Sequence, residues 1–277
     1  MRIDAHQHFW RLDRGDYGWL TPDLAPLYRD FGPEDLHPLA AQADVRATVL
    51  VQAAPTVAET EFLLGIADTS DLVAGVVGWA DFEAPDAAQK IARLAKNPWL
   101  LGLRPMIQDL PDDTWMLRDT LAPAFEAMIG AGLTFDALVL PRHLDALLAL
   151  LARHPGLRVV IDHGAKPEIA TGRIEDWADH MARLAADTGA FCKLSGLITE
   201  AGPDWTTRSL TPYVSHLLDV FGPERLIWGS DWPVCTLAGS YGDWVAATEA
   251  LLGELTPDQR HAIWGNTARR AYPRLRV

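Results

Sequence analysis

Two histidines near the start of the chain, His6 and His8, are separated by one residue in the run Asp4-Ala5-His6-Gln7-His8. On a strand alternate side chains share a face, so Asp4, His6 and His8 are expected on one side, with neighbours about 6.6 Å apart. Two imidazoles at that spacing can lean onto one cation or one carbonyl oxygen. Asp4 is then expected to accept a hydrogen bond that orients an imidazole. Because short motifs arise by chance, this pair indicates a functional site only if further polar groups are predicted to lie beside it.

Two further polar residues each follow an apolar run of strand length. His163 ends Val159-Val160-Ile161-Asp162-His163, and Asp231 ends Ile227-Trp228-Gly229-Ser230-Asp231. Counting alternate positions places His163 on the face of Val159 and Ile161, and Asp231 on the face of Ile227, with space left by Gly229. Three neutral imidazoles and a carboxylate form a set that could serve hydrolysis.

The chemistry of this set can be read in two ways. His6, His8, His163 and Asp231 fit a borderline divalent ion such as zinc, with water at an open position. Asp231 would then be a ligand, the general base that takes the water proton, or both. Without a metal, the imidazoles would hydrogen-bond a carbonyl oxygen while Asp231 deprotonates water. The residues alone leave both readings open.

The elements that must position these groups alternate along the chain. Near-continuous apolar strands separated by amphipathic helices predict a parallel sheet covered by helices, and eight such units close into a barrel. We therefore expect an α/β fold, a (β/α)8 TIM barrel forming a single domain over residues 1–277. After the opening strand the strands are expected at 47–51, 73–79, 100–106, 133–140, 157–162, 191–194 and 226–229, and helices at 87–95, 117–130, 144–154, 177–188 and 213–221, with a start at 33 and a final helix at 256–272.

Such a barrel carries its active site at the carboxyl ends of the strands. His6, His8, His163 and Asp231 all fall at predicted strand ends, and the first and eighth strands are neighbours in a closed barrel. The long aromatic segment from Phe9 to Phe31 is expected to form a lid or a wall of the same pocket.

Composition limits the classes of partner. The chain has 24 Lys+Arg against 37 Asp+Glu, a formal net charge of −13. Nucleic acids and anionic membranes bind basic surfaces, so neither is an expected partner. No apolar run approaches about 18 residues, and no leader-like segment opens the chain. Cys192 and Cys235 show no metal-binding or redox spacing, so a cytoplasmic location is expected.

Several further residues are candidates for the pocket. Arg104 ends the strand at 100–103 and could donate to a carboxyl or hydroxyl group of a substrate, Gln52 follows the second strand, and Trp19 could stack on the apolar face of a substrate ring. Lys193 lies within a strand and must find a partner, so it is expected to be a buried cation serving carboxylates; a Schiff-base role has no other support. The remaining histidines are expected at the surface: His37, His143, His154, His180, His216 and His261.

Taken in order, six motifs resemble the amidohydrolase superfamily, in particular its sugar-lactone hydrolase branch of the fuconolactonase and rhamnonolactonase type, related to pyrone-dicarboxylate lactonase. The motifs are residues 4–10, Gly78-Trp79, residues 102–105, residues 162–167, residues 193–196 and residues 229–233. The resemblance implies a site formed by His6, His8, His163 and Asp231, holding one divalent metal, with zinc as the candidate, that can be dispensable. Strand five offers neither the lysine nor the histidine that holds a second metal in better-known members.

The expected function is therefore a lactonase, a hydrolase that opens a small sugar-acid lactone such as L-fucono- or L-rhamnono-lactone in carbohydrate catabolism. A metal-dependent decarboxylase of the same superfamily is an alternative, and it would need Arg104 to grip a substrate carboxylate. Amide hydrolysis could use the same apparatus. A non-catalytic sugar-binding barrel is a further alternative, although a binding module has no need of the base Asp231.

Overall fold

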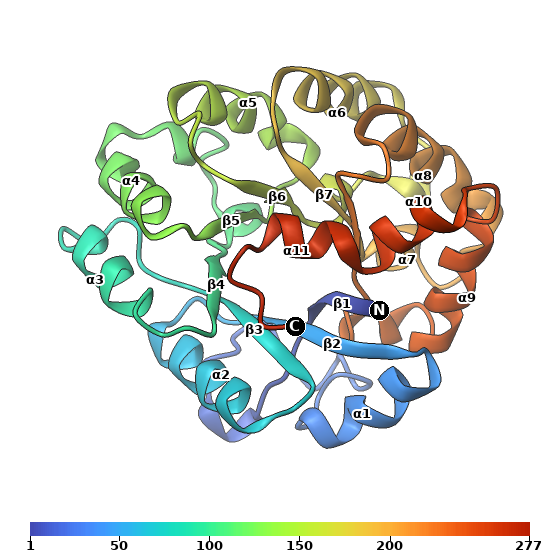
Figure 1. Cartoon of the computed structure of the whole chain (residues 1–277), viewed down its shortest axis with the longest axis horizontal. Helices are drawn as coiled ribbons and strands as arrows, with labels where there is room; N and C mark the ends of the chain where they lie inside the picture. Colours follow the sequence, from blue (N-terminus) through green and yellow to red (C-terminus); the bar gives the residue numbers. More distant parts are fainter.

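The computed structural model describes residues 1–277 and shows eight parallel strands in the order β1 to β8, with helices around them (Figure 1). The predicted (β/α)8 barrel is confirmed. The strands are β1 (Arg2–Gln7), β2 (Val45–Val51), β3 (Val73–Gly78), β4 (Leu100–Leu103), β5 (Thr134–Ala137), β6 (Val159–Ile161), β7 (Phe191–Leu194) and β8 (Leu226–Trp228). Five of them (β3, β4, β5, β6 and β8) are shorter than predicted, because the last residues of each predicted range lie in the segment that follows the strand and not in the sheet.

Backbone hydrogen bonds between β1 and the segment after β8 bring the ends of the sheet together. The N–H of Asp231 donates to the carbonyl of His6 at 2.7 Å, and the N–H of His8 donates to the carbonyl of Trp232 at 2.7 Å. These bonds place Asp231 beside the histidine pair, as expected for neighbouring first and eighth strands.

Helices wrap the sheet in sequence order. They are α1 (Pro33–Gln42), α2 (Val57–Thr69), α3 (Ala87–Leu94), α4 (Ala122–Ala131), α5 (Leu144–Arg153), α6 (Glu175–Asp187), α7 (Leu197–Ala201), α8 (Thr207–Phe221), α9 (Tyr241–Leu251), α10 (Pro257–His261) and α11 (Thr267–Ala271). The predicted final helix is interrupted by a π-helical turn over Ala262–Asn266. None of the helices combines the length and the apolar character needed to cross a membrane.

Apolar side chains form two clusters. The larger lies between the sheet and the surrounding helices. The smaller fills the barrel interior with aliphatic side chains from six strands, among them Ala5, Val49, Val160 and Ile227, and is closed below by Tyr272. This packed interior means that the barrel is a support and not a pore, so the site must lie at one end.

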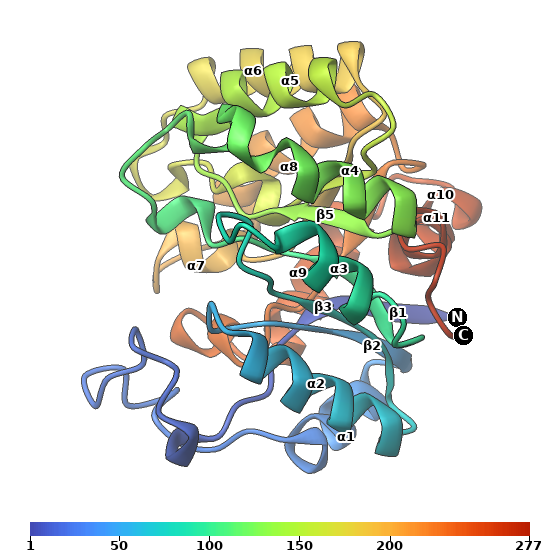
Figure 2. The same cartoon turned by 90° about the vertical axis from the view of Figure 1, so that its left-hand side faces the viewer.

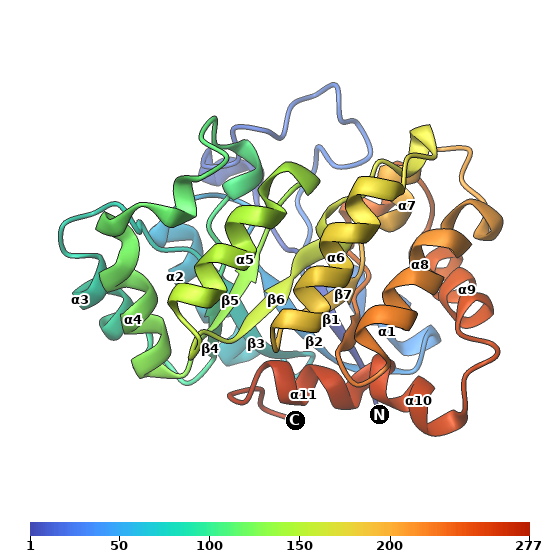
Figure 3. The ribbon, with the colours of Figure 1, turned by 90° about the horizontal axis from the view of Figure 1, so that it is seen from above.

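The two ends of the barrel differ (Figures 2 and 3). Both termini and α10–α11 lie at one end, whereas the long segment after β1, the loops that follow β4, and α7 lie at the other. The predicted pocket wall at 9–31 is pinned at its base by an antiparallel bridge between Trp10 and Phe31. Strand carboxyl ends and this wall therefore share one end of the molecule.

Candidate active site

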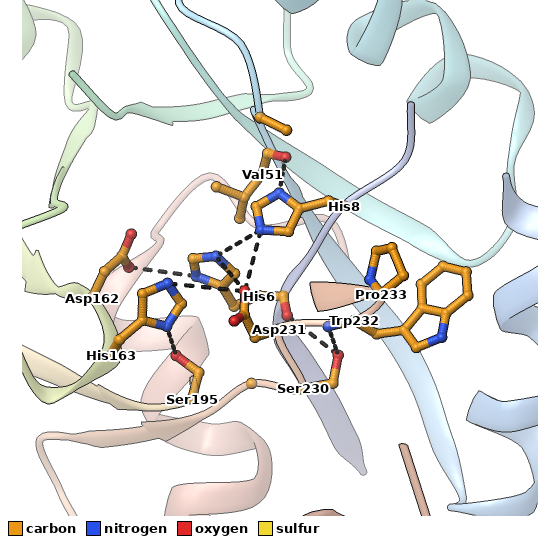
Figure 4. Close-up of polar contacts among 12 residues, drawn as sticks. His6, His8, Val51, Asp162, His163, Ser195, Ser230, Asp231, Trp232 and Pro233 are labelled. Atoms are coloured by element: carbon orange, nitrogen blue, oxygen red, sulfur yellow. Dashed lines mark hydrogen bonds and ion pairs between the residues drawn. The ribbon is translucent and has the colours of Figure 1, made fainter. Parts of the chain in front are cut away.

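The side chains of His6, His8, His163 and Asp231 converge at the mouth of the barrel, as Figure 4 shows. The Oδ1 atom of Asp231 lies 3.3 Å from Nε2 of His8, 3.6 Å from Nε2 of His6 and 3.9 Å from Nε2 of His163. The two Nε2 atoms of His6 and His8 are 3.2 Å apart. Four potential ligand atoms thus surround one small volume.

The β1 strand reaches this point through an irregularity. Its register with β2 shifts between Asp4 and Gln7, which is a β-bulge. Ala5 consequently belongs to the interior cluster, yet His6 also turns inward. The predicted common face of Asp4, His6 and His8 is therefore wrong for Asp4.

Asp4 instead holds the backbone of the site. Its carboxylate accepts the backbone N–H groups of Ser230 at 2.8 Å and His6 at 3.2 Å, and the hydroxyl of Tyr241 from α9 at 3.2 Å. The expectation that Asp4 orients an imidazole ring is wrong. It ties β1 to the segment after β8, and burial raises its pKa to about 6 against these hydrogen bonds.

His163 is also placed by irregular backbone. The strand ends at Ile161, and Val159 and Ile161 pack outward against helices, so simple alternation would send His163 the same way. A left-handed turn with φ of 54° at His163 brings its ring to the mouth instead. Gly196 leaves room for it, because a Cβ there would lie 2.7 Å from Nδ1 of His163.

His8 and His163 each have a hydrogen-bond partner on Nδ1, the ring nitrogen that does not face Asp231. Nδ1 of His8 donates to the carbonyl of Val51 at 2.8 Å, and Nδ1 of His163 lies 2.8 Å from the hydroxyl of Ser195. Because a carbonyl oxygen only accepts, Nδ1 of His8 carries a proton, so the neutral tautomer of this ring has its lone pair on Nε2, the nitrogen that faces His6 and Asp231. That is the form in which histidine binds a metal.

Burial sets the protonation of the group. It lowers the pKa of His163 to about 4, and burial with the nearby charge of Lys193 lowers that of His6 well below 6.5. Burial alone would raise the pKa of Asp231, but the surrounding imidazoles outweigh it and hold that pKa well below 3.8. The rings of His6 and His163 are therefore neutral and the Asp231 carboxylate is ionised over the physiological pH range.

Beneath His6 lies a fully buried charge network that the sequence indicated only in part. Nζ of Lys193 lies 2.5 Å from Oδ2 of Asp136 and 2.8 Å from Oδ1 of Asp162. The Tyr272 hydroxyl also donates to Asp136, at 2.6 Å. The predicted role of Lys193 as a buried cation serving carboxylates agrees with these contacts. Asp162 belongs to the motif at 162–167 but was not predicted as a site residue, and it also lies 3.5 Å from Nδ1 of His6.

Arg104 and Gln52 lie together at the mouth. The guanidinium of Arg104 donates to the side-chain oxygen of Gln52 at 3.0 Å, to its carbonyl, and to Asp162 at 3.4 Å. Nε2 of Gln52 in turn donates to the carbonyl of Arg104 at 2.9 Å. Gln52 is fully buried, and its contacts make it a support for Arg104 at the edge of the pocket.

A cavity of about 290 Å³ opens above these groups. Its lining mixes polar and apolar residues: His8, Trp19, Leu24, Ala53, Arg104, Met106, Gln108, Asp109, Leu138, His163, Lys166, Asp231, Val234 and Leu237. Trp19 and Leu24 belong to the 9–31 segment, which therefore forms a pocket wall. The Trp19 indole donates to the carbonyl of Ala53 at 2.8 Å, so this wall is fixed to the end of β2.

The other histidines lie away from this cavity. His37 and His261 are exposed, and His154, His180 and His216 are half-buried. His143 contradicts the expected surface position because it is fully buried, with its Nδ1 accepting the N–H of Leu140 at 3.0 Å. It serves the start of α5 as a local backbone cap.

Known proteins resemble the chain over nearly its whole length. The family model described as amidohydrolase matches residues 3–274. The chain is 51% identical over 271 residues to a protein of Burkholderia ambifaria named L-fucono-1,5-lactonase, covering 96% of this chain and 93% of the relative. It is 38% identical to a protein of the same name from Burkholderia multivorans, covering 98% and 96%.

A solved structure gives the same grouping. A zinc-bound amidohydrolase from Burkholderia multivorans has a TM-score of 0.92 and 37% identity, covering 99% of each chain. The family match and the 51% identity both extend over the strands that carry the four converging residues. This chain belongs to the amidohydrolase family.

Proposed function

We propose that this chain is a lactonase that opens the ring ester of a sugar-acid lactone, with L-fucono-1,5-lactone as the first substrate to test. The observation that carries the proposal is the convergence of the Asp231 carboxylate with the imidazoles of His6, His8 and His163 beneath a cavity of about 290 Å³. The cavity suits one sugar ring, and its apolar lining suits the methyl group of a 6-deoxy sugar. The two relatives named L-fucono-1,5-lactonase support the same substrate class.

In the proposed reaction Asp231 acts as general base and takes a proton from water. The resulting oxygen nucleophile attacks the lactone carbonyl carbon, and negative charge develops on the carbonyl oxygen. That oxygen lies among the rings of His6 and His163 and near the guanidinium of Arg104, whose NH1 is 3.4 Å from Nε2 of His6. Collapse of the tetrahedral species breaks the ring C–O bond, and Asp231 returns the proton to the departing oxygen.

We also propose that the site holds one divalent ion, with zinc as the candidate. The donor set fits: the Val51 carbonyl makes Nε2 of His8 a lone-pair donor, and the facing atoms of His6, His163 and Asp231 lie within 4.8 Å of one another. When bound, the ion would supply Lewis acidity that polarises the lactone carbonyl. The zinc-bound relative supports this assignment.

Proton release from a panel of aldono-lactones and one pyrone dicarboxylate tests the function. Asp231→Asn is expected to lower kcat by about 10²- to 10⁴-fold, the usual contribution of a general base, while calorimetry still detects the bound lactone. Asp219→Asn, on an exposed position of α8, is the matched control and should leave the rate unchanged. Failure of the wild-type protein to hydrolyse any lactone, with metal present in equimolar amount, would refute the proposal.

The same experiment separates the alternatives. A decarboxylase would release carbon dioxide from a substrate acid and leave every lactone intact. A non-catalytic sugar-binding barrel would bind the lactone as the wild-type protein and as Asp231→Asn, and neither protein would hydrolyse it. Metal analysis with rates before and after chelation then decides whether the ion is required for turnover.

A further inference from the structure

The turn that places His163 continues in a left-handed conformation as far as Lys166. The φ angles are 54° at His163, 58° at Gly164, 60° at Ala165 and 51° at Lys166. Only the glycine adopts this region freely, and each other residue costs about 1–2 kcal/mol there. Strain of this kind persists where the surrounding structure fixes it, and it gathers at ligand sites.

The consequence of this turn is that two side chains three residues apart reach one cavity. Both His163 and Lys166 line it. The N–H of Lys166 donates to the carbonyl of His163 at 2.9 Å, which closes the turn. The strained backbone thus brings an ammonium group into the cavity that His8 and His163 also line.

The ammonium of Lys166 differs from the other cations of the region in having no hydrogen-bond partner. Its nearest carboxylate oxygen, on Glu200, lies 3.7 Å from Nζ, and its side chain is 22% exposed. In contrast, Arg104 donates to Gln52 and Asp162, and Lys193 is enclosed by two carboxylates. The NH1 and NH2 groups of Arg104 already have partners in the protein and its Nε is buried, whereas Lys166 offers all of its N–H groups to a ligand in the cavity.

We propose that Lys166 is a substrate-binding residue that donates hydrogen bonds to hydroxyl oxygens of the sugar lactone, and so selects hydroxyl-bearing lactones over unsubstituted ones. This inference rests on the proposed lactonase function. Removing such a donor weakens binding of the lactone that presents its hydroxyl groups and leaves a lactone without them unaffected. It does not require that Lys166 take part in proton transfer.

The test compares L-fucono-1,5-lactone with δ-valerolactone, which has no hydroxyl groups. Lys166→Met is expected to raise KM for the sugar lactone by about 10-fold or more, the scale of one hydrogen bond to a charged donor, and to change kcat/KM for δ-valerolactone less than 3-fold. Lys166→Arg should recover part of the loss. Glu200→Gln is the matched control, because it removes the partner of the loose ion pair and should leave the sugar-lactone KM unchanged.

A second readout does not depend on turnover. Acetylation of lysines, followed by mass spectrometry, should be slowed at Lys166 by saturating L-fuconate, with Lys90 and Lys96 as unprotected references. Equal losses for both lactones in Lys166→Met, or an effect of Glu200→Gln equal to that of Lys166→Met, would overturn the inference. So would absence of protection at Lys166. If the wild-type protein hydrolyses no lactone, the proposed function itself fails, which is a separate result.

Discussion

Replacing Lys193 by methionine should cost the barrel a large part of its stability. The ammonium is fully buried between Asp136, at 2.5 Å, and Asp162, at 2.8 Å. Methionine has a similar length, so the substitution removes the charge and leaves little empty volume. Two buried carboxylates would then face each other without their shared cation.

The magnitude follows from that loss. Removing one partner of a buried ion pair costs about 3–5 kcal/mol, because the remaining charge stays desolvated. Total stabilities of domains are only about 5–15 kcal/mol. With a urea slope of about 3 kcal/mol per molar, the unfolding midpoint should fall by about 1 to 1.7 M. Urea titration followed by circular dichroism measures the shift.

A double-mutant cycle identifies its cause. Asp136→Asn in the Lys193→Met background removes one of the uncompensated carboxylates, so the double variant should recover part of the lost free energy of unfolding. The carboxamide can still accept the hydroxyl of Tyr272, now 2.6 Å from the carboxylate. A loss below about 1 kcal/mol in Lys193→Met, or strict additivity in the cycle, would refute the electrostatic reasoning.

Two further changes test other features of the fold. Asp44→Gly should raise the free energy of unfolding by about 0.5–1 kcal/mol, because Asp44 follows α1 with a φ of 55°, a conformation that favours glycine. The midpoint of thermal unfolding should rise by a few degrees. A gain of the same size in Asp44→Ala would contradict this reason. Burial raises the pKa of Glu59 from 4.5 to about 7, against hydrogen bonds from the backbone of Ala53 and Ala54. The folded state then holds a proton that the unfolded state releases above 4.5, so this group's contribution to stability should fall by about 3 kcal/mol as pH rises from 4.5 through 7. Glu59→Gln should lack this fall in urea titrations at pH 5 and 8, and parallel pH dependence in both proteins would contradict the assignment.

The alternation of apolar runs with amphipathic helical stretches was sufficient to predict the barrel, because each element is recognised from many residues and an error at one residue changes little. Apolar runs marked all eight strands, and β7 (Phe191–Leu194) agrees residue for residue. The helices α2 (Val57–Thr69) and α9 (Tyr241–Leu251) were not predicted. Burial in α2 follows one face, but that face includes Glu59 and Thr60 while the exposed face includes Ala58 and Gly65, so the sequence shows no clear separation of apolar and polar residues.

The residues of the candidate site could be predicted from their types and positions at strand ends, but the side of the strand to which each side chain points could not. His6, His8, His163 and Asp231 were chosen for following strands, and their convergence needs only that parallel strands end at one rim. Counting alternate positions failed for Asp4, because the bulge in β1 adds a residue to that strand. It also failed for His163, whose ring reaches the mouth through left-handed backbone.

Both failures lie where the chain leaves the barrel, and this position has a physical reason. A regular strand sends only alternate side chains inward. A regular β1 could therefore not fill the barrel interior and also direct His6 and His8 to the mouth above it. Regular backbone after β6 could likewise not direct both His163 and Lys166 into one cavity. A bulge and a left-handed turn supply these directions at a cost in local free energy. The network of Lys193 with Asp136 and Asp162 anchors the same region from below. Irregular backbone above a buried charge network therefore turns the rim of this barrel into a site. The left-handed turn at 163–166 brings Lys166 into the cavity, and residue spacing in the sequence does not reveal such a turn.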